Sequence, residues 1–392
     1  MLKAVRSFNQ RNMKILKQWP LLICFLTCQL HAGEYGHLTL FGEVSHSEGI
    51  ADSIRSEADI NPSVAVDILY TYDASRVSVL AEYYLSEDES ELERLELGLR
   101  LNNWSSIKAG LLHNPAEYWL NEHHNASYSQ TSITKPFQSL IGFPGGITNQ
   151  HLSGVQWLNE LTLPNDSTFS FDYTYAASPD LAIEVPDVNV DDFFAHDNAL
   201  NLSIIHIRFT PFVFNDSSIG ISYSDGDVGI EQQSLIQLLG PFSTAFSDSH
   251  IDQSTLNIYA NIETDRWRFI LSHLDEDVTL ENSNPIAIAF VTQDNTLNFK
   301  LNYLHAEYTL TDHFLMFSRH EKSSPSEDIS GLTQVLTNVL DFDLNYEKTI
   351  IGTRWDFSKR QAITLQYSDH STPQNKQNIL HLNWSFVWDT GL

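Results

Sequence analysis

Apolar and polar side chains alternate along many short segments of the chain after residue 32. From Ile379 onward, for example, the apolar Leu382 and Trp384 alternate with polar residues. Successive side chains of a β-strand point to opposite faces, so this period of two predicts a strand with one apolar and one polar face. The same period recurs in apolar rows at residues 64–70, 95–101, 169–175, 297–303 and 363–367.

The chain contains sixteen segments of this kind, which we expect to be strands. They lie near residues 37–46, 63–73, 75–87, 91–102, 104–112, 151–160, 167–176, 198–210, 217–224, 254–263, 266–274, 296–308, 313–320, 342–357, 361–370 and 377–388. Tight polar turns such as 264–265 and 311–312 follow every second strand, and mostly longer segments such as 47–62 and 225–253 separate the others. Short periplasmic turns on one rim and long extracellular loops on the other are typical of an outer-membrane barrel.

A soluble β-sandwich is the alternative fold, because its strands alternate in the same way. Two features favour the barrel. Tyrosine and tryptophan stand at the ends of apolar rows, as at Tyr70, Trp267 and Trp388, where a membrane barrel carries its aromatic girdles. The polar faces carry charged side chains in mid-strand, which need water on that side. We therefore predict an all-β fold, a transmembrane antiparallel β-barrel of about 16 strands, with bulges near 204–205 and 350–351, where the period slips.

The first 32 residues differ from the rest of the chain. Five Lys and Arg side chains, with no acidic residue among them, precede an apolar run from Trp19 to Thr27. This pattern predicts a cleavable signal peptide at residues 1–32 and a mature barrel at residues 33–392 that is exported to the outer membrane. An uncleaved anchor helix is the alternative, but the apolar run is far shorter than the ~20 residues that span a bilayer.

Charge narrows the set of partners. The 392 residues include 22 Lys+Arg and 50 Asp+Glu, a formal net charge of -28 at pH 7. Nucleic-acid binders concentrate positive charge to displace phosphate counterions, so a nucleic-acid partner is excluded. The expected partners are the lipid bilayer with its outer-membrane lipids and small polar or ionic solutes. The pattern leaves open whether the barrel is a monomer or a homotrimer.

With these features the sequence resembles the outer-membrane porins of Gram-negative bacteria. A narrower resemblance, to a block in a family of uncharacterised porin-like proteins, covers residues 110–155. It rests on several short sequence motifs. Their residues include His113, Pro115, Tyr118, Trp119, His123, His124, Lys135, Pro136, Gly145 and Gly146. The resemblance implies that the third long loop, residues 113–150, folds into the lumen and narrows it. A long loop rich in Pro, Gly and aromatic residues independently suits a folded segment. An external lid over the mouth is the alternative.

Charged residues on the polar faces of the strands are the candidate pore lining. They are Glu82, Arg94, Glu96, Arg100, Lys108, Asp172, Arg208, Glu263, Arg268, Lys300 and Arg354. Acidic residues crowd the loops at 180–197 and 225–252, and rings of carboxylates concentrate cations and repel anions. We therefore expect a water-filled channel for passive diffusion of small polar solutes, with a weak preference for cations. Adaptation to a saline habitat, or simple solubility of the loops, is the alternative explanation of the acidic charge.

Candidate chemistry is sparse. The adjacent pair His123-His124 has acidic neighbours and offers ligands for Zn(II) or Cu(II), but adjacent side chains diverge, so we expect no bound metal or other cofactor. The sequence has no Gly-x-Ser-x-Gly elbow and no His-Glu-x-x-His helix, so we expect no enzymatic activity. An outer-membrane phospholipase would need a serine partner for a histidine on the lipid-facing wall, and none is compelling. A non-conducting barrel that acts as a surface adhesin or scaffold is the main alternative to a porin.

Overall fold

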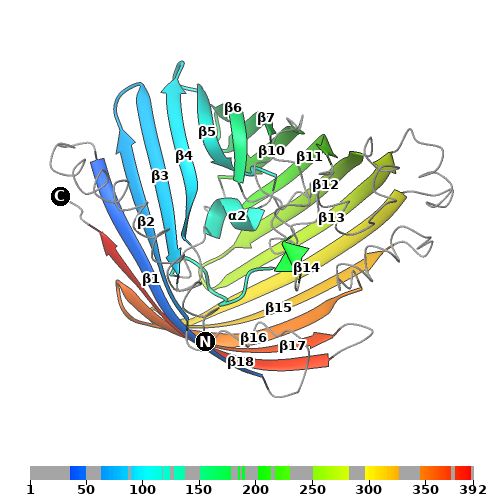
Figure 1. Ribbon diagram of the computed structural model, residues 1–392. Helices are drawn as coiled ribbons and strands as arrows, with labels where there is room; N and C mark the ends of the chain where they lie inside the picture. The colour runs from blue at the N-terminus through cyan, green and yellow to red at the C-terminus, as the bar shows by residue number, and fades with distance from the viewer. Residues whose placement is uncertain are drawn as a thin grey trace, which may run out of the picture.

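The computed structural model describes residues 36–49, 63–86, 90–116, 118–123, 128–136, 151–177, 184–185, 188–189, 202–212, 217–229, 250–281, 296–325, 345–371 and 376–389. The predicted signal peptide, residues 1–32, lies outside these ranges. Within them, sixteen strands form one closed antiparallel barrel (Figure 1). A short pair, β8 (Glu184–Val185) and β9 (Val188–Asn189), forms a separate two-stranded sheet.

The barrel strands follow one another in chain order around the wall. Their bounds are β1 (Gly36–Gly49), β2 (Ser63–Asp73), β3 (Val77–Ser86), β4 (Ser90–Arg100), β5 (Ser105–His113), β6 (His151–Thr162), β7 (Thr168–Ala177), β10 (Leu202–Thr210), β11 (Ser218–Gly229), β12 (His250–Glu263), β13 (Trp267–Glu281), β14 (Thr296–Thr311), β15 (Phe314–Pro325), β16 (Glu347–Ser358), β17 (Gln361–Ser371) and β18 (Lys376–Asp389). A short helix, α2 (Tyr118–His123), lies between β5 and β6 in the chain. Among the described residues, no helix has the length and hydropathy to cross a membrane. Every predicted strand is present, which confirms the predicted fold class.

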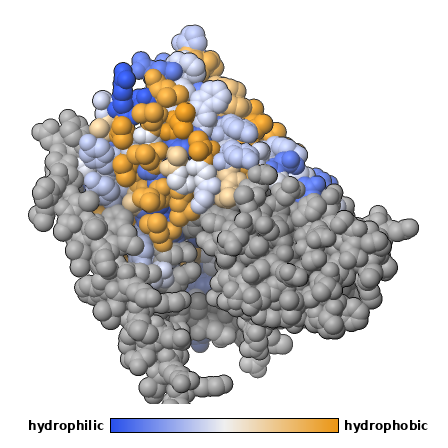
Figure 2. All heavy atoms as spheres, turned by 45° about the horizontal axis from the view of Figure 1, so that its top comes forward, coloured by the Kyte–Doolittle hydropathy of each residue, from blue (hydrophilic) through white to orange (hydrophobic). Residues whose placement is uncertain are grey.

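Much of the outer wall is apolar and much of the inner wall is polar, the reverse of a water-soluble protein. Leu382 of β18 is 47% exposed, whereas its neighbours His381 and Asn383 are each 2% exposed. The same contrast separates Leu97 of β4, which is exposed, from the buried Glu96. Figure 2 shows apolar side chains gathered side by side on the face that it presents. Hydrocarbon contacts a membrane barrel from outside, so these rows mark its lipid-facing surface.

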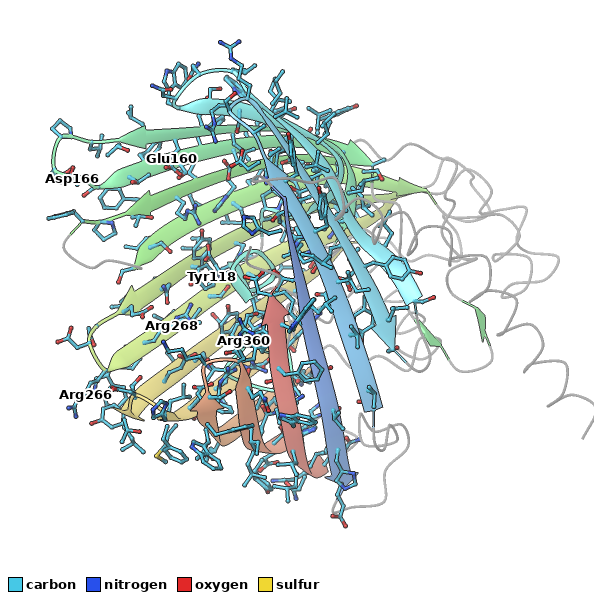
Figure 3. All side chains as sticks on the ribbon, turned by 90° about the vertical axis from the view of Figure 1, so that its left-hand side faces the viewer. Tyr118, Glu160, Asp166, Arg266, Arg268 and Arg360 are labelled. Carbon is cyan, nitrogen blue, oxygen red and sulfur yellow. The ribbon has the colours of Figure 1, made fainter. Side chains whose placement is uncertain are left out.

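Most connections sort by length onto two rims, although β3 to β4 (residues 87–89) and β17 to β18 (residues 372–375) are short connections on the rim of the longer ones. Tight turns join β2 to β3, β4 to β5, β6 to β7, β12 to β13, β14 to β15 and β16 to β17. Figure 3 shows two of the turn residues, Asp166 and Arg266, at the same end of the barrel. The predicted alternation of tight turns with longer connections is therefore confirmed. Most residues of the longer connections lie outside the described ranges.

The first and last strands close the barrel. β1 and β18 pair in unbroken antiparallel register over eleven residue pairs. Gly42 lies opposite Phe386 in this seam, and a Cβ atom at position 42 would collide with the Phe386 ring. Across the same seam, the Asn383 amide donates to the Glu43 carboxylate at 3.1 Å. Position 42 therefore requires glycine, because any side chain would displace the ring.

One predicted apolar row has the opposite orientation. On β14, Leu301 is fully buried and faces the interior, whereas Leu304 is 46% exposed on the outer face. Lys300 shares the face of Leu304, and its Nζ lies 3.4 Å from the Asp275 carboxylate of β13. The prediction that Lys300 faces the lumen is therefore wrong. The physical reason is that protein, rather than water, covers the inner face of β14.

The register is regular at both positions where the sequence predicts a bulge. Ile204 and Ile350 are fully buried, and the residues that follow them, Ile205 and Ile351, are exposed. Adjacent isoleucines thus serve opposite faces of an unbroken strand. The register shifts lie elsewhere, at Glu82/Tyr83, Thr309/Thr311 and Trp355/Ser358.

Candidate functional site

The chain leaves the barrel wall after β5 and enters the barrel. Asn114 is fully buried, and its Oδ1 accepts a hydrogen bond from the Ala116 backbone N–H at 2.9 Å, which turns the chain. The helix α2 follows inside the ring of strands (Figure 1). We call the described residues of 114–123 and 128–136 the inward segment. It is part of the loop 113–150 that the sequence predicts as a constriction.

The inward segment is fixed first to β11 and β12. The Ala116 carbonyl accepts hydrogen bonds from Ser222 Oγ and from Asn257 Nδ2, both at 2.8 Å. Ser272 Oγ of β13 donates to Asn257 Oδ1 at 2.9 Å and so orients the amide. Buried polar groups need hydrogen-bond partners. Here the Ala116 carbonyl of the segment is the acceptor for the buried Ser222 and Asn257 side chains of the wall.

Charged and aromatic side chains of the wall hold the helix α2. The Arg268 guanidinium donates to the Tyr118 hydroxyl at 3.1 Å, and the Tyr118 ring centroid lies 4.9 Å from that of Tyr259. Burial raises the pKa of Tyr118 to about 12, because the phenolate would lose its hydration. Toward the other end of the helix, Arg208 of β10 donates to the Glu122 carboxylate at 2.9 Å.

Trp119 is the apolar centre of the contact between the inward segment and the wall. Its side chain is fully buried, and its ring lies edge-on to the His305 ring at a centroid distance of 5.6 Å. The Arg319 guanidinium lies over the Trp119 ring, 5.3 Å from its centroid. A cation above an indole is attracted by the ring quadrupole. Trp119 therefore joins the segment to both β14 and β15.

Arg319 of β15 binds the second part of the inward segment. Its side chain has no exposed surface. Its Nη1 donates to Ser132 Oγ at 2.9 Å, and its Nη2 donates to the carbonyl oxygens of Thr134 at 2.8 Å and Lys135 at 2.9 Å. Its Nε lies 2.7 Å from the carboxylate of Glu321, which is equally buried. The planar guanidinium thus holds three groups of the segment and keeps a compensating charge.

Two further strands bind the same stretch. Thr131 Oγ1 donates to the Glu307 carboxylate of β14 at 2.6 Å, and the same carboxylate oxygen lies 2.9 Å from His305 Nε2. Gln366 of β17 accepts from the Ile133 backbone N–H at 2.8 Å. Its amide also donates to Thr134 Oγ1 at 3.0 Å. The backbone of the segment is therefore bound in one orientation.

Arg354 of β16 completes the attachment. Its Nη1 donates to the Gln130 carbonyl at 2.6 Å, and its Nε donates to Asp356 at 2.9 Å. The guanidinium lies 5.3 Å from the centroid of the Tyr128 ring. The Tyr128 hydroxyl donates to the Lys359 carbonyl at 2.7 Å, and burial raises the pKa of this phenol.

These contacts attach the inward segment to every strand from β10 to β17. Three of the predicted wall residues, Arg208, Arg268 and Arg354, bind the segment. Sequence reasoning missed Arg319 and Glu307. For Arg319 the signal is weak, because β15 carries polar side chains on both faces and so its alternation does not show which face lies inside. Glu307 is in phase with Leu301 and Tyr303 on β14, a row whose apolar character favours the lipid-facing side.

The wall of β3 to β5 carries a separate charged network. Arg94 Nε lies 2.5 Å from the Glu82 carboxylate, and Arg94 Nη1 lies 3.9 Å from Glu96. Lys108 Nζ lies 3.0 Å from Glu96. Arg94, Glu82 and Glu96 are buried. All four residues are predicted wall residues, and the structure brings them together.

Asp172 and Glu263 have partners on neighbouring strands. Asp172 Oδ2 lies 3.1 Å from His206 Nδ1, and His206 Nε2 lies 2.8 Å from the Tyr259 hydroxyl. Glu263 lies 3.8 Å from Arg268 Nε. The chain of contacts therefore links the predicted wall residues to the tyrosine that packs against α2.

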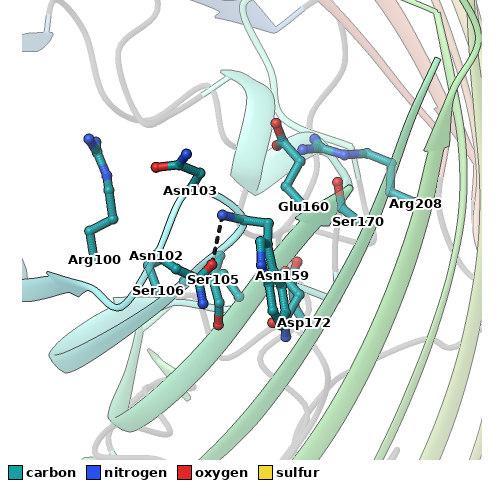
Figure 4. Close-up of a pocket in the computed structure, with 12 residues that line it drawn as sticks. Arg100, Asn102, Asn103, Ser105, Ser106, Asn159, Glu160, Ser170, Asp172 and Arg208 are labelled. Atoms are coloured by element: carbon teal, nitrogen blue, oxygen red, sulfur yellow. Dashed lines mark hydrogen bonds between the residues drawn. The ribbon is translucent and has the colours of Figure 1, made fainter. Parts of the chain in front are cut away.

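A cavity of about 230 Å³ lies near the turn that joins β4 to β5 (Figure 4). Its lining combines Arg100 with Glu160, Ser170, Asp172 and Arg208 from β6, β7 and β10. Both signs of charge meet there, so the cavity suits polar rather than apolar solutes.

The remaining predicted loop residues are only partly described. His113, Pro115 and Pro136 are buried, and the carbonyl of Lys135 binds Arg319. Of His123 the structure describes the backbone alone. Three further predicted residues lie outside the described ranges, namely His124, Gly145 and Gly146.

Comparison with known proteins identifies the architecture. No protein-family model matches the sequence, and no curated protein matches it. Among solved structures, OmpF of Salmonella typhi in complex with daunomycin is 9% identical at a TM-score of 0.57, and the match covers 90% of this chain and 97% of that one. The anion-selective porin of Comamonas acidovorans is 10% identical at a TM-score of 0.55, with 90% and 98% covered. OmpT of Vibrio cholerae, an outer membrane protein described in a trimer form, is 10% identical at a TM-score of 0.52, with 91% and 100% covered.

Identities this low establish the fold alone. The narrower resemblance of residues 110–155 to a porin-like family stays a prediction. The closed wall of sixteen described strands, its exposed apolar rows and its likeness to these structures agree with one another. The chain is therefore a porin-like transmembrane β-barrel.

Proposed function

We propose that this protein is a porin of the outer membrane, a water-filled channel for the passive diffusion of small polar solutes. The observation that carries the proposal is the inward segment, which is bound to the inner wall from β10 to β17. The contacts of that segment given above do not involve the wall of β2 to β5, which carries Arg94, Glu96 and Lys108. Solutes would pass between the inward segment and this charged wall.

Single-channel conductance in planar bilayers tests the proposal. We expect the refolded mature chain, residues 33–392, to conduct, and a variant without residues 118–133 to conduct in larger steps because the constriction is gone. Arg266→Ala, in a turn, is the matched control and leaves the conductance unchanged. Far-UV circular dichroism shows whether each variant is folded. The absence of any conductance from folded wild-type protein would contradict the proposal.

A weak preference for cations is the finer part of the proposal. Acidic groups such as Asp172 and Glu263 lie on the inner wall and are part of the formal net charge of -28 of the chain. Fixed carboxylates raise the local concentration of cations. Reversal potentials in a potassium chloride gradient measure the preference. We expect a cation-selective sign that moves toward zero in Asp172→Asn, and an anion-selective wild type would refute it.

We propose no enzymatic activity for this barrel. A phospholipase would need a serine and histidine pair on the lipid-facing wall. Two histidines that lie outside on the described strands have other partners, because His273 Nδ1 lies 2.8 Å from Asn302 Oδ1 and His320 Nδ1 lies 3.0 Å from Thr349 Oγ1. Release of fatty acids from phospholipid by the purified protein would overturn this. An adhesin or scaffold is separated from a porin by liposome swelling, since only a channel admits sugar.

Self-association is suggested by a set of polar side chains on the outer wall, which we call the outer polar patch. Its members come from β13 to β16 and are His273, Asp275, Asn298, Lys300, Asn302, His320 and Thr349. His273 lies six residues from Trp267 at the turn end of β13. At ~3.3 Å per residue and a tilt of ~40°, that is about 15 Å into an apolar band about 25 Å tall.

Polar side chains are expensive in hydrocarbon. We therefore propose that a second copy covers the outer polar patch in a homotrimer, the form described for the Vibrio cholerae barrel. Analytical ultracentrifugation in detergent tests this. Ser318→Trp, beside the patch, is expected to reduce the trimer to monomers, whereas Leu382→Trp on β18 leaves the mass unchanged. A monomeric wild type would contradict the proposal.

A further inference from the structure

A cluster of acidic side chains lies inside the wall where β2, β3 and β4 meet the end of β5. Asp67, Glu82, Glu93 and Glu96 are each at most 6% exposed. His113, the last residue of β5, is buried beside them. One ligand atom each of Glu82, Glu93 and His113 lies within 4.8 Å of the other two.

A register shift creates this cluster. Glu82 of β3 pairs with Arg94, but the next residue, Tyr83, pairs with Leu92, so that Glu93 is the extra residue of a β-bulge. In a regular strand Glu93 would share the outer face with Leu95, which is exposed. A bulge re-aims the extra side chain, and such bulges are common beside functional sites. The irregular backbone therefore places a third carboxylate next to Glu82 and His113.

The charges of the cluster do not cancel. Within the described ranges, the cations that contact it are Arg94 and Lys108, which reach Glu82 and Glu96. Four carboxylates face these two cations, which leaves a formal excess of two negative charges when all of them are ionised. Burying a net negative charge is costly, so the balance among the described residues of this cluster favours a bound cation or a shared proton.

Asp67 is the second and independent observation. It is 4% exposed, and neither oxygen of its carboxylate accepts from an N–H or hydroxyl donor in the described part of the chain. Its hydrogen-bonding neighbour is the Glu82 carboxylate, so two acceptors face each other and need a proton or a cation between them. Its charged neighbours are Glu82, Glu93 and Arg94, so the carboxylate is directed into the cluster. A buried acceptor that no donor reaches is the feature expected of a ligand to a bound cation.

We propose that Glu82, Glu93 and His113 bind a divalent transition cation, with Zn²⁺ as the best match, and that the neighbouring Asp67 carboxylate adds negative charge beside the ion. Carboxylate oxygen and imidazole nitrogen are both zinc ligands at about 2.0–2.2 Å, and three such ligands leave one position of a tetrahedral site for water. Calcium prefers six to eight oxygen ligands, which this set lacks. The site departs from the sequence expectation of no metal, and it does not use the pair His123-His124.

The position of His113 gives the ion a structural consequence. β5 ends at His113, and the inward segment begins at the next residue, Asn114. An ion held by β3, β4 and His113 would therefore fix the direction in which the chain leaves the wall. Zinc would therefore stabilise the start of the inward segment, at Asn114. The contacts of the segment with Arg319 lie at its other end, at Ser132 to Lys135.

Isothermal titration of zinc chloride into chelator-treated full-length protein in detergent tests the site. We expect one equivalent of zinc to bind, with at least tenfold weaker binding in His113→Gln and in Glu93→Gln. His313→Gln, which removes an exposed histidine from the turn between β14 and β15, is the matched control and leaves zinc binding unchanged. Far-UV circular dichroism shows that each variant keeps its β-structure.

X-ray absorption at the zinc edge keeps the proposal testable on the wild type, should the variants fail to fold. We expect one imidazole nitrogen and two or three carboxylate oxygens around zinc. Several imidazoles would overturn the proposal in favour of another histidine site. Equal zinc binding by wild type and folded His113→Gln, binding of calcium but not zinc, or no binding at all would also overturn it. In the last case the buried carboxylates share a proton instead.

Discussion

On β18, apolar side chains such as Leu382 face outward and polar ones such as Asn383 face inward, whereas residues 299–303 of β14 show the reverse arrangement. There, Leu301 and Tyr303 are buried on the inner face, and Asn302 lies outside. Both strands belong to one closed sheet with the same alternation. The backbone geometry of the two strands is therefore the same. What differs is whether lipid, water or protein lies against each face.

The difference between the two sectors shows what determines the apolar side of a barrel strand. β18 contacts lipid on the outside. β14 contacts the inward segment on the inside, because Trp119 packs at His305 and Thr131 binds Glu307. Where protein fills the interior, the wall there behaves like the core of a soluble protein, and an outer polar patch becomes compatible with folding if another chain covers it.

The largest effect is expected when the contacts on the inner face of β15 are removed. Arg319→Met removes the guanidinium from Glu321 and from the inward segment, and breaking a buried ion pair costs about 3–5 kcal/mol. We expect lower stability in denaturant titration and larger conductance steps. Arg360→Met, in an exposed turn, is the control. Unchanged stability and conductance in Arg319→Met would show that the segment is held by other contacts.

A pair of leucine substitutions sharpens the comparison. Leu301→Ala leaves a cavity inside the packed sector and should cost about 2–5 kcal/mol, because both the transfer free energy and packing are lost. Leu382→Ala on the outer face of β18 should cost roughly half as much or less, since lipid fills the space. Urea unfolding of the two variants measures the difference. Equal costs would mean that β14 is not packed as a core.

The outer faces are compared by introducing a charge. Leu382→Lys places an ammonium among lipid tails and should cost about 2–4 kcal/mol near the middle of the bilayer. Ser318→Lys, beside the outer polar patch, should cost less than about 1 kcal/mol if lipid is excluded there. Folding titrations in lipid vesicles give both values. A comparable cost at both positions would argue against a covered patch.

The smallest effect concerns pH. Burial raises the pKa of Tyr118 from 10.0 to about 12, so between these values the folded state keeps a proton that the unfolded state has lost. The stability from the neutral phenol is therefore complete below pH 10 and is lost as pH rises toward 12. Tyr118→Phe should remove this part of the pH dependence. Unfolding at pH 9 and pH 11 checks it, and an identical slope in both proteins would contradict it.

The sequence predicts the strands well because each strand carries its own alternation. All sixteen expected segments are strands in the structure, including β2 with the same bounds, residues 63–73. The turns are predictable for the same local reason. A local pattern does not show what lies on each side of a strand, which is why Lys300 was assigned to the wrong face.

The candidate site is less predictable because it depends on contacts distant in sequence. Arg208, Arg268 and Arg354 were expected on the inner wall, but their binding to the inward segment follows only from the fold. Arg319 lies on a strand with two polar faces, so no period distinguishes its inner side. Glu93 is moved by a bulge that no pattern marks, and the zinc proposal depends on it.

The seam between β1 and β18 has a consequence for how the molecule is made. The two strands that form the seam lie at opposite ends of the described chain. The Phe386 ring of β18 packs against Gly42 of β1, so this contact forms only when both strands are in place. A nascent or truncated chain without its last strand would keep two unpaired edges that invite pairing with other molecules. We therefore expect the wall to close only once β18 is available, and the unfinished chain to need protection of its two free edges until then.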